Sequence, residues 1–269
     1  MKYHLPSDET FGQRCFRVGA LGALALLVFG LCFSSCHKLC GQSVLIPAYD
    51  ASTGELALRL CPPAKLKALT LIINPNSGPG DSLDTSYSRL IRGCNAKGVR
   101  ALRYVGLMAF PGDGLNSPSS KEHVKTPQEL NKERALYEKF YAGTLKFDGW
   151  FFDDVRAGMD ESYLCIAAWP GRKVMNPGGV WVPPPVLADC IVVVSEQAGT
   201  WPRTLTAWEW SHRQQCAVMG LCISSQSLPA FMKSTAGMAY CYASPLDDKW
   251  KQGQSAYSSL TPHFGRLFR

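Results

Sequence analysis

The sequence predicts an α/β fold: a single (β/α)8 barrel of the TIM type that follows an N-terminal export segment. Short apolar runs recur along the chain, and several of them, such as Leu-Ile-Ile and Ile-Val-Val-Val, are continuous rather than alternating. Continuous runs indicate strands that are buried on both faces, as in a parallel sheet covered by helices. Helical or turn-rich stretches separate the runs and polar residues stand at their ends, which is typical of a barrel.

An open doubly wound sheet is the alternative architecture. Such a sheet usually carries a glycine-rich nucleotide turn, and the chain has neither Gly-x-Gly-x-x-Gly nor a Walker loop. The barrel interpretation places eight strands, in chain order, at Ser43–Tyr49, Leu69–Asn74, Ala101–Leu107, Gly149–Asp154, Lys173–Asn176, Cys190–Glu196, Cys216–Ile223 and Met238–Ala243.

The clearest connecting helix begins after Thr126, with Pro127 at its first position and Glu129 as the partner of the cap. Apolar side chains then recur at helical spacing up to about Lys146. Residues 111–125 are polar and rich in turn formers, so we expect a loop there. Two more helices are expected, and each stops at a glycine: Tyr87–Lys97 at Gly98, and Leu228–Thr235 at Gly237.

The composition is that of a globular protein, with 46% hydrophobic, 11% aromatic and 18% charged residues. A disordered chain would be more charged and less aromatic. The net charge of +7 is scattered, and no basic run carries interleaved aromatic residues, so nucleic-acid binding is not expected. The five histidines are dispersed and no Cys-x-x-Cys pair occurs, so a metal site is not expected. No organic cofactor is expected either.

Residues 1–41 are predicted to be a signal peptide or an N-terminal membrane anchor, and the barrel domain is expected at 42–269. Arg14 and Arg17 precede the one long uncharged apolar run, residues 18–33, and small residues follow it. This order is typical of a secretory signal, and the run is short for a membrane span, which needs about 20 residues. We expect the barrel to be secreted, or held outside the membrane by this segment alone.

Eleven cysteines fit an exported protein. Four of them lie in or beside the N-terminal segment. The other seven form an odd number, so at least one stays unpaired unless Cys40 or another chain supplies a partner. Several stand within apolar runs, where a free thiol behaves as a small buried apolar group.

Candidate catalytic residues stand where barrel enzymes place their reactive groups, at the carboxyl ends of strands. Asp153 and Asp154 follow the fourth expected strand, and Glu196 ends the sixth. Adjacent carboxylates can simply cap a helix, but carboxyl groups after apolar runs are costly to bury without a partner or a purpose. Four further residues near strand ends are expected to bind substrate: Tyr49, Asn74, Tyr104 and Asn176.

Several motifs follow one another in a fixed order: Leu-Ile-Ile-Asn-Pro-Asn-Ser-Gly-Pro-Gly at 71–80, Gly-Trp-Phe-Phe-Asp-Asp at 149–154, Asn-Pro-Gly at 176–178 and Asp-Cys-Ile-Val-Val-Val-Ser-Glu at 189–196. Together they resemble the pattern of spherulation-specific family 4, the spherulin-like proteins. Pro47-x-Tyr49 is similar to the opening strand of that family, and the segment from Tyr257 to Phe264 is similar to its closing segment.

That family includes the (β/α)8 glycoside hydrolases of family 135, which cleave galactosamine-containing polysaccharides. The resemblance implies a glycosidase that acts on an amino-sugar polysaccharide similar to galactosaminogalactan, with catalytic roles for Asp153, Asp154 and Glu196. In this interpretation Asp153 is the nucleophile or charge stabiliser, Glu196 is the general acid/base, and Asp154 supports them or serves as an alternative acid. The sequence leaves an exchange of these roles open.

Three departures from the family pattern favour a different function. Asp154 stands where Glu is usual, the segment after Tyr104 lacks the usual Thr and Tyr, and the seventh strand lacks a His at its end. The alternative is a catalytically degenerate carbohydrate-binding protein, or a structural protein of the cell wall or spore. Binding needs an aromatic and amide lining but no acid–base pair, so turnover of substrate distinguishes the two.

Overall fold

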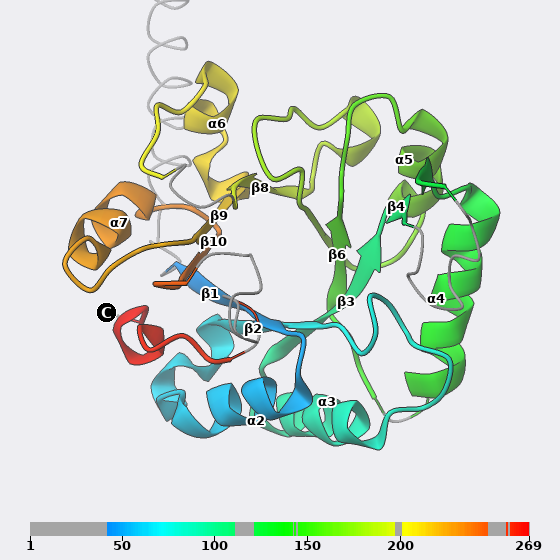
Figure 1. Cartoon of the computed structure of the whole chain (residues 1–269), viewed down its shortest axis with the longest axis horizontal. Coiled ribbons are helices and arrows are strands. Elements are labelled where there is room, and N and C mark those ends of the chain that lie inside the picture. The colour runs from blue at the N-terminus through cyan, green and yellow to red at the C-terminus, as the bar shows by residue number, and fades with distance from the viewer. Residues whose placement is uncertain are drawn as a thin grey trace, which may run out of the picture. The chain divides into compact units, whose positions relative to one another are not determined.

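The structure is a computed structural model, and it describes residues 42–110, 121–141, 143, 145–196, 201–246, 257 and 259–268. Eight parallel strands form the centre of the molecule: β1 (Ser43–Ala48), β2 (Leu69–Ile73), β3 (Arg100–Gly106), β6 (Gly149–Asp153), β7 (Arg172–Met175), β8 (Ile191–Ser195), β9 (Cys216–Gly220) and β10 (Tyr240–Ala243). They close into a barrel in the order β1-β10-β9-β8-β7-β6-β3-β2 (Figure 1). The fold class predicted from the sequence is confirmed.

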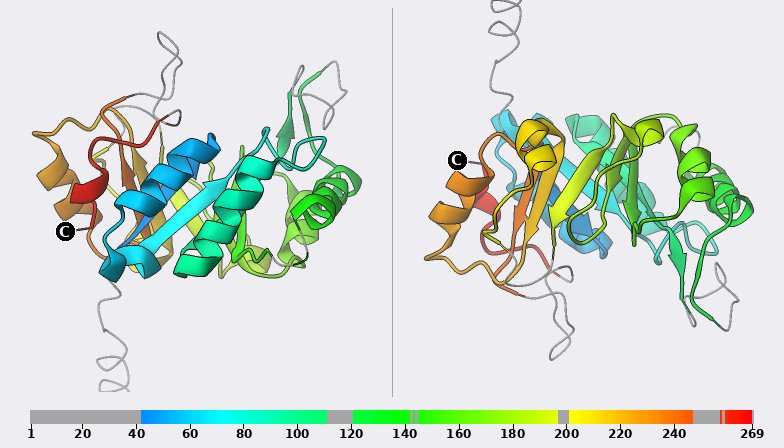
Figure 2. Two further views of the ribbon diagram at one scale, coloured as in Figure 1. Left: turned by 90° about the horizontal axis from the view of Figure 1, so that it is seen from below. Right: turned by 90° about the horizontal axis from the view of Figure 1, so that it is seen from above.

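Helices follow the strands and surround the barrel in Figure 1. The α-helices are α2 (Ala51–Leu60), α3 (Thr85–Lys97), α4 (Pro127–Tyr141), α5 (Asp160–Ala167), α6 (Ala207–Ser211) and α7 (Leu228–Thr235). Short 3-10 helices complete the connections: η1 (Pro63–Ala68), η3 (Pro185–Leu187), η4 (Arg213–Gln215) and η5 (Phe264–Arg266). A small antiparallel pair, β4 (Met108–Ala109) and β5 (His123–Val124), follows β3 and stands out from the barrel in Figure 2.

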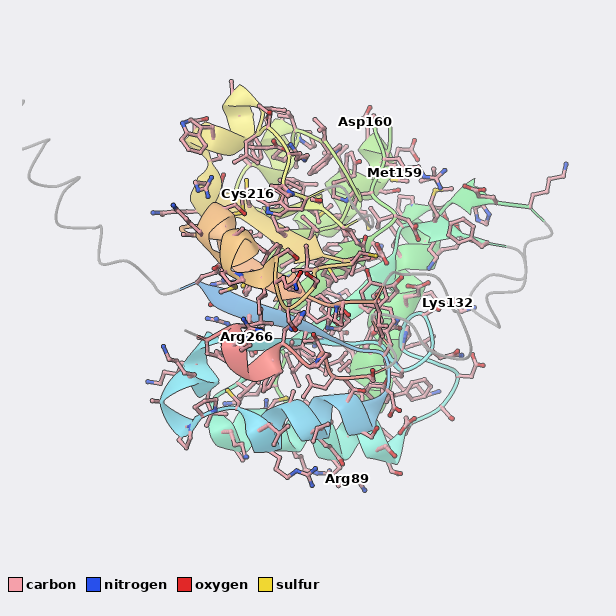
Figure 3. The ribbon with its side chains drawn as sticks, turned by 60° about the vertical axis from the view of Figure 1, so that its left-hand side comes forward. Arg89, Lys132, Met159, Asp160, Cys216 and Arg266 are labelled. Carbon is pink, nitrogen blue, oxygen red and sulfur yellow. The ribbon has the colours of Figure 1, made fainter. Side chains whose placement is uncertain are left out.

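Burial explains why the strand sequences are continuously apolar. Every residue of β2, β8, β9 and β10 is buried, because helices cover the outside of the barrel and side chains fill its inside. Figure 3 shows the side chains that crowd around the strands and helices. Charged groups such as Arg89 on α3 point away from the barrel, and Arg89 pairs with Glu55 of α2 at 2.6 Å.

Local signals set the helix ends. The side chain of Asp84 caps α3, and Gly98 ends that helix in the left-handed conformation at φ +67°. The capping box predicted for α4 is present, because the Thr126 amide donates to Glu129 Oε2 at 2.8 Å and the Glu129 amide donates back to Thr126 Oγ1. This helix ends at Tyr141 rather than near Lys146, since Gly143 adopts φ +100°.

Other sequence-based boundaries need small corrections. The strand expected over Cys216–Ile223 ends at Gly220, because Cys222 adopts φ +58°, which no strand residue does. Part of the loop expected at 111–125 pairs as β5, while 111–120 lie outside the described residues. Three helices escaped the sequence analysis: α2, α5 and α6.

Most cysteine side chains of the described residues are buried and none forms a disulfide. All seven cysteines within the described residues are free, and five of them are buried: Cys61, Cys94, Cys190, Cys216 and Cys241. Cys15, Cys32, Cys36, Cys40 and the predicted export segment at 1–41 lie outside the described residues. Within the described part of the chain, no helix is both long enough and apolar enough to span a membrane.

Gly149 opens β6 against the backbone of Arg172 on β7, its register partner. A Cβ atom at this glycine would lie far inside van der Waals distance of the Arg172 carbonyl oxygen and nitrogen. Only a glycine lets the two strands pair here, and this pairing places the carboxyl end of β6 beside that of β7.

We therefore expect Gly149→Ala to lower the free energy of unfolding by about 3 kcal/mol, the upper range of overpacking in a closed core. Gly265→Ala is the matched control, because a Cβ there meets no atom within 4 Å. Urea denaturation of the two variants measures the difference. Equal stability of the two variants would contradict this account of the β6–β7 pairing.

Candidate functional site

The candidate site lies at the carboxyl ends of three neighbouring strands. Asp153 is the last residue of β6, Asn176 directly follows β7 and Glu196 directly follows β8. Backbone hydrogen bonds continue past the strand ends, since the Asn176 amide donates to the Phe152 carbonyl at 2.7 Å and the Val155 amide donates to the Asn176 carbonyl at 3.2 Å. These bonds hold the Asp153 and Asn176 backbones side by side.

Asn176 joins the two carboxyl groups. Its Nδ2 donates to Asp153 Oδ1 at 2.8 Å and, over a shorter distance, to Glu196 Oε2. The side chain is only 1% exposed, and its own oxygen accepts a hydrogen bond from the Gly178 amide at 3.2 Å. Because a buried amide cannot turn without losing these bonds, it fixes the two carboxyl groups relative to each other.

Asp153 accepts two further hydrogen bonds. Tyr104, on β3, donates its hydroxyl to Oδ2 at 2.8 Å, and the backbone amide of Asp154 donates to Oδ1 at 3.0 Å. Burial raises the pKa of Asp153, and the hydrogen bonds from Tyr104, the Asp154 amide and Asn176 offset part of that rise. Asp153 is thus a partly buried carboxyl with both oxygens held by donors.

Glu196 is held from the other side by Tyr257, whose hydroxyl donates to Oε1 at 2.7 Å. An irregularity in the β8–β9 register between Val193 and Ser195 comes just before Glu196, and such irregularities turn the following side chain. The sequence analysis did not choose Tyr257 as a site residue, because it does not stand at a strand end. Its only signal was its place at the start of the family-like closing segment.

Tyrosine rings line the carboxyl pair. Tyr49, at the end of β1, packs edge-on against Tyr104 with ring centroids 5.6 Å apart, and tilted against Tyr257 at 5.5 Å. The pKa of each of these three hydroxyls is raised, first by burial and then by the negative charge of the carboxylates beside it. They therefore stay protonated and remain hydrogen-bond donors throughout the ordinary pH range.

Asp154 occupies a strained turn. Its backbone adopts φ +56°, a conformation that is uncommon for residues other than glycine and is best tolerated by Asn and Asp. Its Oδ2 lies over Gly106, where a Cβ atom would be 3.5 Å away. The charge of Asp154 also contributes to the raised pKa of Tyr49, so a third carboxylate belongs to the same electrostatic environment.

Asn74 has a role in the loop after β2. It is 7% exposed, and its Oδ1 accepts a hydrogen bond from the Gly78 amide at 3.0 Å, which closes the Asn-Pro-Asn-Ser-Gly turn. The structure thus brings Tyr49, Tyr104 and Asn176 to the carboxyl pair, but commits the Asn74 oxygen to its own loop. Their predicted contacts with substrate stay predictions.

A buried ion pair links β8 to α6. Arg203 donates to the Val194 carbonyl of β8 at 2.7 Å and to both carboxylate oxygens of Glu209 on α6. Glu209 is 1% exposed. Burial alone would raise its pKa, but the hydrogen bonds from Arg203 and from the Thr206 amide lower it, so the pair remains charged.

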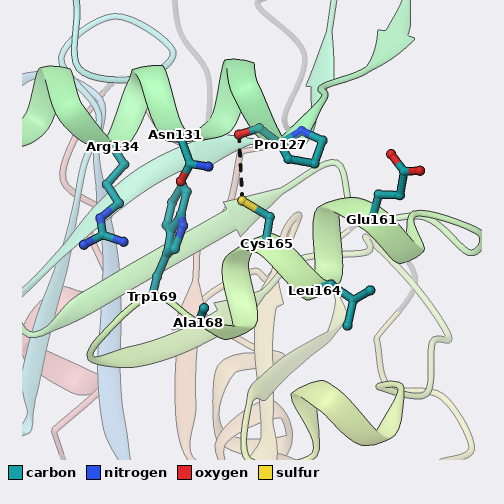
Figure 4. Close-up of a pocket in the computed structure, with 8 residues that line it drawn as sticks. All are labelled: Pro127, Asn131, Arg134, Glu161, Leu164, Cys165, Ala168 and Trp169. Carbon is teal, nitrogen blue, oxygen red and sulfur yellow. Dashed lines mark hydrogen bonds between the residues drawn. The ribbon is translucent and has the colours of Figure 1, made fainter.

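The described residues offer no group of three His, Cys, Asp or Glu side chains that could hold a metal ion. Within the same residues, a hollow of about 500 Å³ lies on the outer wall between α4 and α5 (Figure 4). Cys165 lines it and contacts the Pro127 carbonyl at 3.8 Å, and the Arg134 guanidinium lies 5.8 Å from the Trp169 ring. None of the candidate site residues lines this hollow.

Comparison with known structures supports the fold. The crystal structure of Aspergillus clavatus Sph3 in complex with GalNAc matches with a TM-score of 0.58 and 17% identity, over 86% of this chain and 98% of that one. A truncated 3-deoxy-D-arabino-heptulosonate 7-phosphate synthase from Thermotoga maritima matches at 10% identity, over 85% and 83% of the chains, with a TM-score of only 0.43. No curated protein matches the sequence.

The closed parallel barrel and its mouth define the class: a (β/α)8-barrel protein with two facing carboxyl groups held by one buried amide. Within that class the family is also established. The model of spherulation-specific family 4 matches residues 44–267, and the chain belongs to this family. The resemblance stated from the sequence motifs is thereby confirmed.

Asp154 combines a strained backbone with a charge close to other carboxyl groups, so we expect its side chain to lower the stability of the fold. Asp154→Asn keeps a residue type that tolerates φ +56° and removes the charge of one of three clustered carboxyl groups. We expect it to raise the free energy of unfolding at pH 7 by roughly 1 kcal/mol, the size of one repulsion between partly exposed charges. Asp81→Asn, in an exposed loop, is the control. An Asp154→Asn variant that is no more stable in urea than this control contradicts the account.

Proposed function

We propose that this protein is a glycoside hydrolase that cleaves an amino-sugar polysaccharide similar to galactosaminogalactan. The observation that carries the proposal is the carboxyl pair on Asn176, since glycoside hydrolysis needs one carboxylic acid and one carboxylate on either side of the scissile bond. Membership of spherulation-specific family 4 and the fold shared with Sph3, which was crystallised with GalNAc, support a sugar polymer as the substrate.

The spacing of the pair favours a retaining reaction. Asp153 Oδ1 and Glu196 Oε2 bond to the same nitrogen, so they lie no farther apart than the two hydrogen bonds laid end to end. This upper limit is shorter than the separation of about 6.5–9.5 Å at which inverting enzymes place a water between their carboxyl groups, and it is compatible with the roughly 5–5.5 Å of retaining enzymes.

In this mechanism Asp153 is the nucleophile and Glu196 is the general acid/base. Glu196 gives its proton to the glycosidic oxygen while an oxygen of Asp153 bonds to the anomeric carbon and the bond to the leaving group breaks. Glu196 then takes a proton from water, and the hydroxide displaces Asp153 from the sugar. The donors on Asp153 stabilise its charge before and after the covalent step.

Three tyrosine rings supply the apolar surface that a sugar-binding site needs. The rings of Tyr49, Tyr104 and Tyr257 provide apolar surface beside the carboxyl pair, where the apolar face of a sugar ring can pack. We further propose that the enzyme acts outside the cell, either released after cleavage of residues 1–41 or anchored by them, because its substrate class is extracellular and the N-terminal segment has the features of an export signal.

Removal of either carboxylate is expected to abolish hydrolysis without unfolding the barrel. Asp153→Asn and Glu196→Gln keep the acceptor that faces Asn176, and the tyrosine hydroxyl on the other side can accept instead of donating. Each should lower kcat by at least about a hundredfold, the size of a lost acid–base or nucleophilic contribution. The rate at which reducing ends are released from galactosamine- and glucosamine-containing polymers measures this decrease in kcat.

Two controls complete that experiment. Glu138→Gln, on the exposed side of α4, should leave activity unchanged. Asp153→Asn should unfold at the same or a higher temperature than the wild type, because burial disfavours the charge that the substitution removes. Wild-type turnover that survives both active-site substitutions rules out the mechanism. Tight binding of oligosaccharides by the wild type with no turnover makes the protein a carbohydrate-binding module instead.

The rise of activity with pH should reflect Asp153. Only the ionised form attacks, and burial raises its pKa, so the ascending limb of kcat/KM should lie above the ordinary aspartate pKa of about 3.9. The descending limb should report Glu196, because activity is lost when the acid gives up its proton. A pH–rate profile measures both limbs. Activity that climbs steadily into alkaline pH is incompatible with the two-carboxyl mechanism.

A further inference from the structure

The two carboxyl groups are held in different ways. Asp153 has two side-chain torsions and three donors: Tyr104, Asn176 and the Asp154 amide. Glu196 has one more torsion, and it stands where β8 gives way to a loop. A longer side chain loses more rotamer freedom when it is fixed, so Glu196 needs a second tether to keep the alignment that Asn176 begins.

The C-terminal segment supplies that tether. The Thr261 hydroxyl donates to the Ala243 carbonyl at the end of β10, and His263 Nε2 donates to the Ile223 carbonyl beyond β9, both at 2.7 Å. His263 is buried, and the Phe264 ring packs edge-on against Phe268. In Figure 1 the short helix η5 lies between α7 and α2, and the two hydrogen bonds attach this segment to the end of β10 and to the residues that follow β9.

Tyr257 precedes these hydrogen-bonded residues in the sequence. Its ring is tilted against Tyr49 of the β1 end and Tyr242 of β10, with centroids 5.5 Å and 6.5 Å apart. Its hydroxyl is aimed at Glu196 Oε1 at 2.7 Å, while Asn176 bonds to Oε2. Two donors on opposite oxygens fix both the direction and the plane of the carboxyl group.

We infer that Tyr257 is a positioning residue, which aligns the Glu196 carboxyl for proton transfer from a segment of the chain 61 residues away. The role of Glu196 as the acid rests on the proposed function, whereas the contact itself does not. Tyr257 acts as a donor to a carboxylate and so favours the ionised form of Glu196. Its own pKa is raised by burial and by the charge of Glu196, so it does not lose this proton in the working range.

Within the part of the chain that the structure describes, the titratable groups around this contact come from several neighbouring elements. They are Asp153 of β6, Tyr49 of the β1 end, Tyr104 of β3, Tyr242 of β10 and Asp154. The tyrosines among them have raised pKa values and stay neutral, and Asp153 and Asp154 are present in all the variants proposed below. A change confined to Tyr257 therefore isolates its effect on Glu196.

Tyr257→Phe keeps the ring and removes the hydroxyl. Loss of the donor should raise the pKa of Glu196, so the descending limb of the pH–rate profile should move to higher pH by about one unit, the size of one hydrogen bond to a charged group. Misalignment of the acid should lower kcat by about tenfold or more, with less than about a threefold change in KM.

Tyr240→Phe is the matched control. It also removes a tyrosine hydroxyl from a buried ring, but that hydroxyl accepts a hydrogen bond from Arg172, at the amino-terminal start of β7. A loss of packing or of stability would affect both variants alike, whereas a shift of the descending limb should occur in Tyr257→Phe alone. A descending limb at the same pH in both variants, or an unchanged kcat in Tyr257→Phe, overturns the inference.

A direct titration separates this inference from the proposed function. Protein labelled with carboxyl-¹³C glutamate reports the pKa of Glu196 by NMR, with the resonance assigned by its loss in Glu196→Gln. We expect this pKa to be higher in Tyr257→Phe than in the wild type and in Tyr240→Phe. An unchanged value overturns the role of Tyr257 even if the wild type is active. A wild type that hydrolyses none of the polymers overturns the proposed function. The titration still tests whether the Tyr257 hydroxyl lowers the pKa of Glu196.

Discussion

Closure of a parallel barrel is the constraint on which the rest of this structure depends. Because all eight strands run in one direction, their carboxyl ends meet at one mouth, and residues that are distant in sequence become neighbours there. The close approach of Gly149 to Arg172 sets the β6–β7 register, which in turn places Asp153 beside Asn176. A shift of one residue at this pairing would point the carboxyl group to the other face of the sheet.

Carboxyl groups cluster at the mouth of the barrel, where neutral amide and hydroxyl groups donate hydrogen bonds to them. Asn176, Tyr104 and Tyr257 surround Asp153 and Glu196, and the raised pKa of each tyrosine keeps it a donor. Elsewhere the barrel balances buried charge by direct pairing, as in Arg203 with Glu209 and Lys125 with Glu133. A carboxyl group paired with a cation would stay ionised and could not exchange a proton, so amide and hydroxyl partners suit a group that must do so.

Much of this arrangement was readable from the sequence, because it follows strand ends. The apolar runs predicted the strands to within a few residues, and the polar residues after them included Asp153, Asn176 and Glu196. The same reasoning missed Tyr257, which no strand presents, and it did not show that the Asn74 oxygen closes the loop around Gly78. It also missed α2, α5 and α6: α5 has no side-chain cap, and α6, although Thr206 and Glu209 form a capping box, is only five residues long.

The sequence by itself determined the eight strands of the barrel, the start of α4 and the family to which the chain belongs, because each of these depends on neighbouring residues and their order. Only the tertiary structure decided that Asn176 spans two carboxyl groups and that the C-terminal segment delivers Tyr257 to Glu196. These contacts join residues 20 to 61 positions apart. Their geometry is set by the closure and register of the barrel, which no local pattern of residues records.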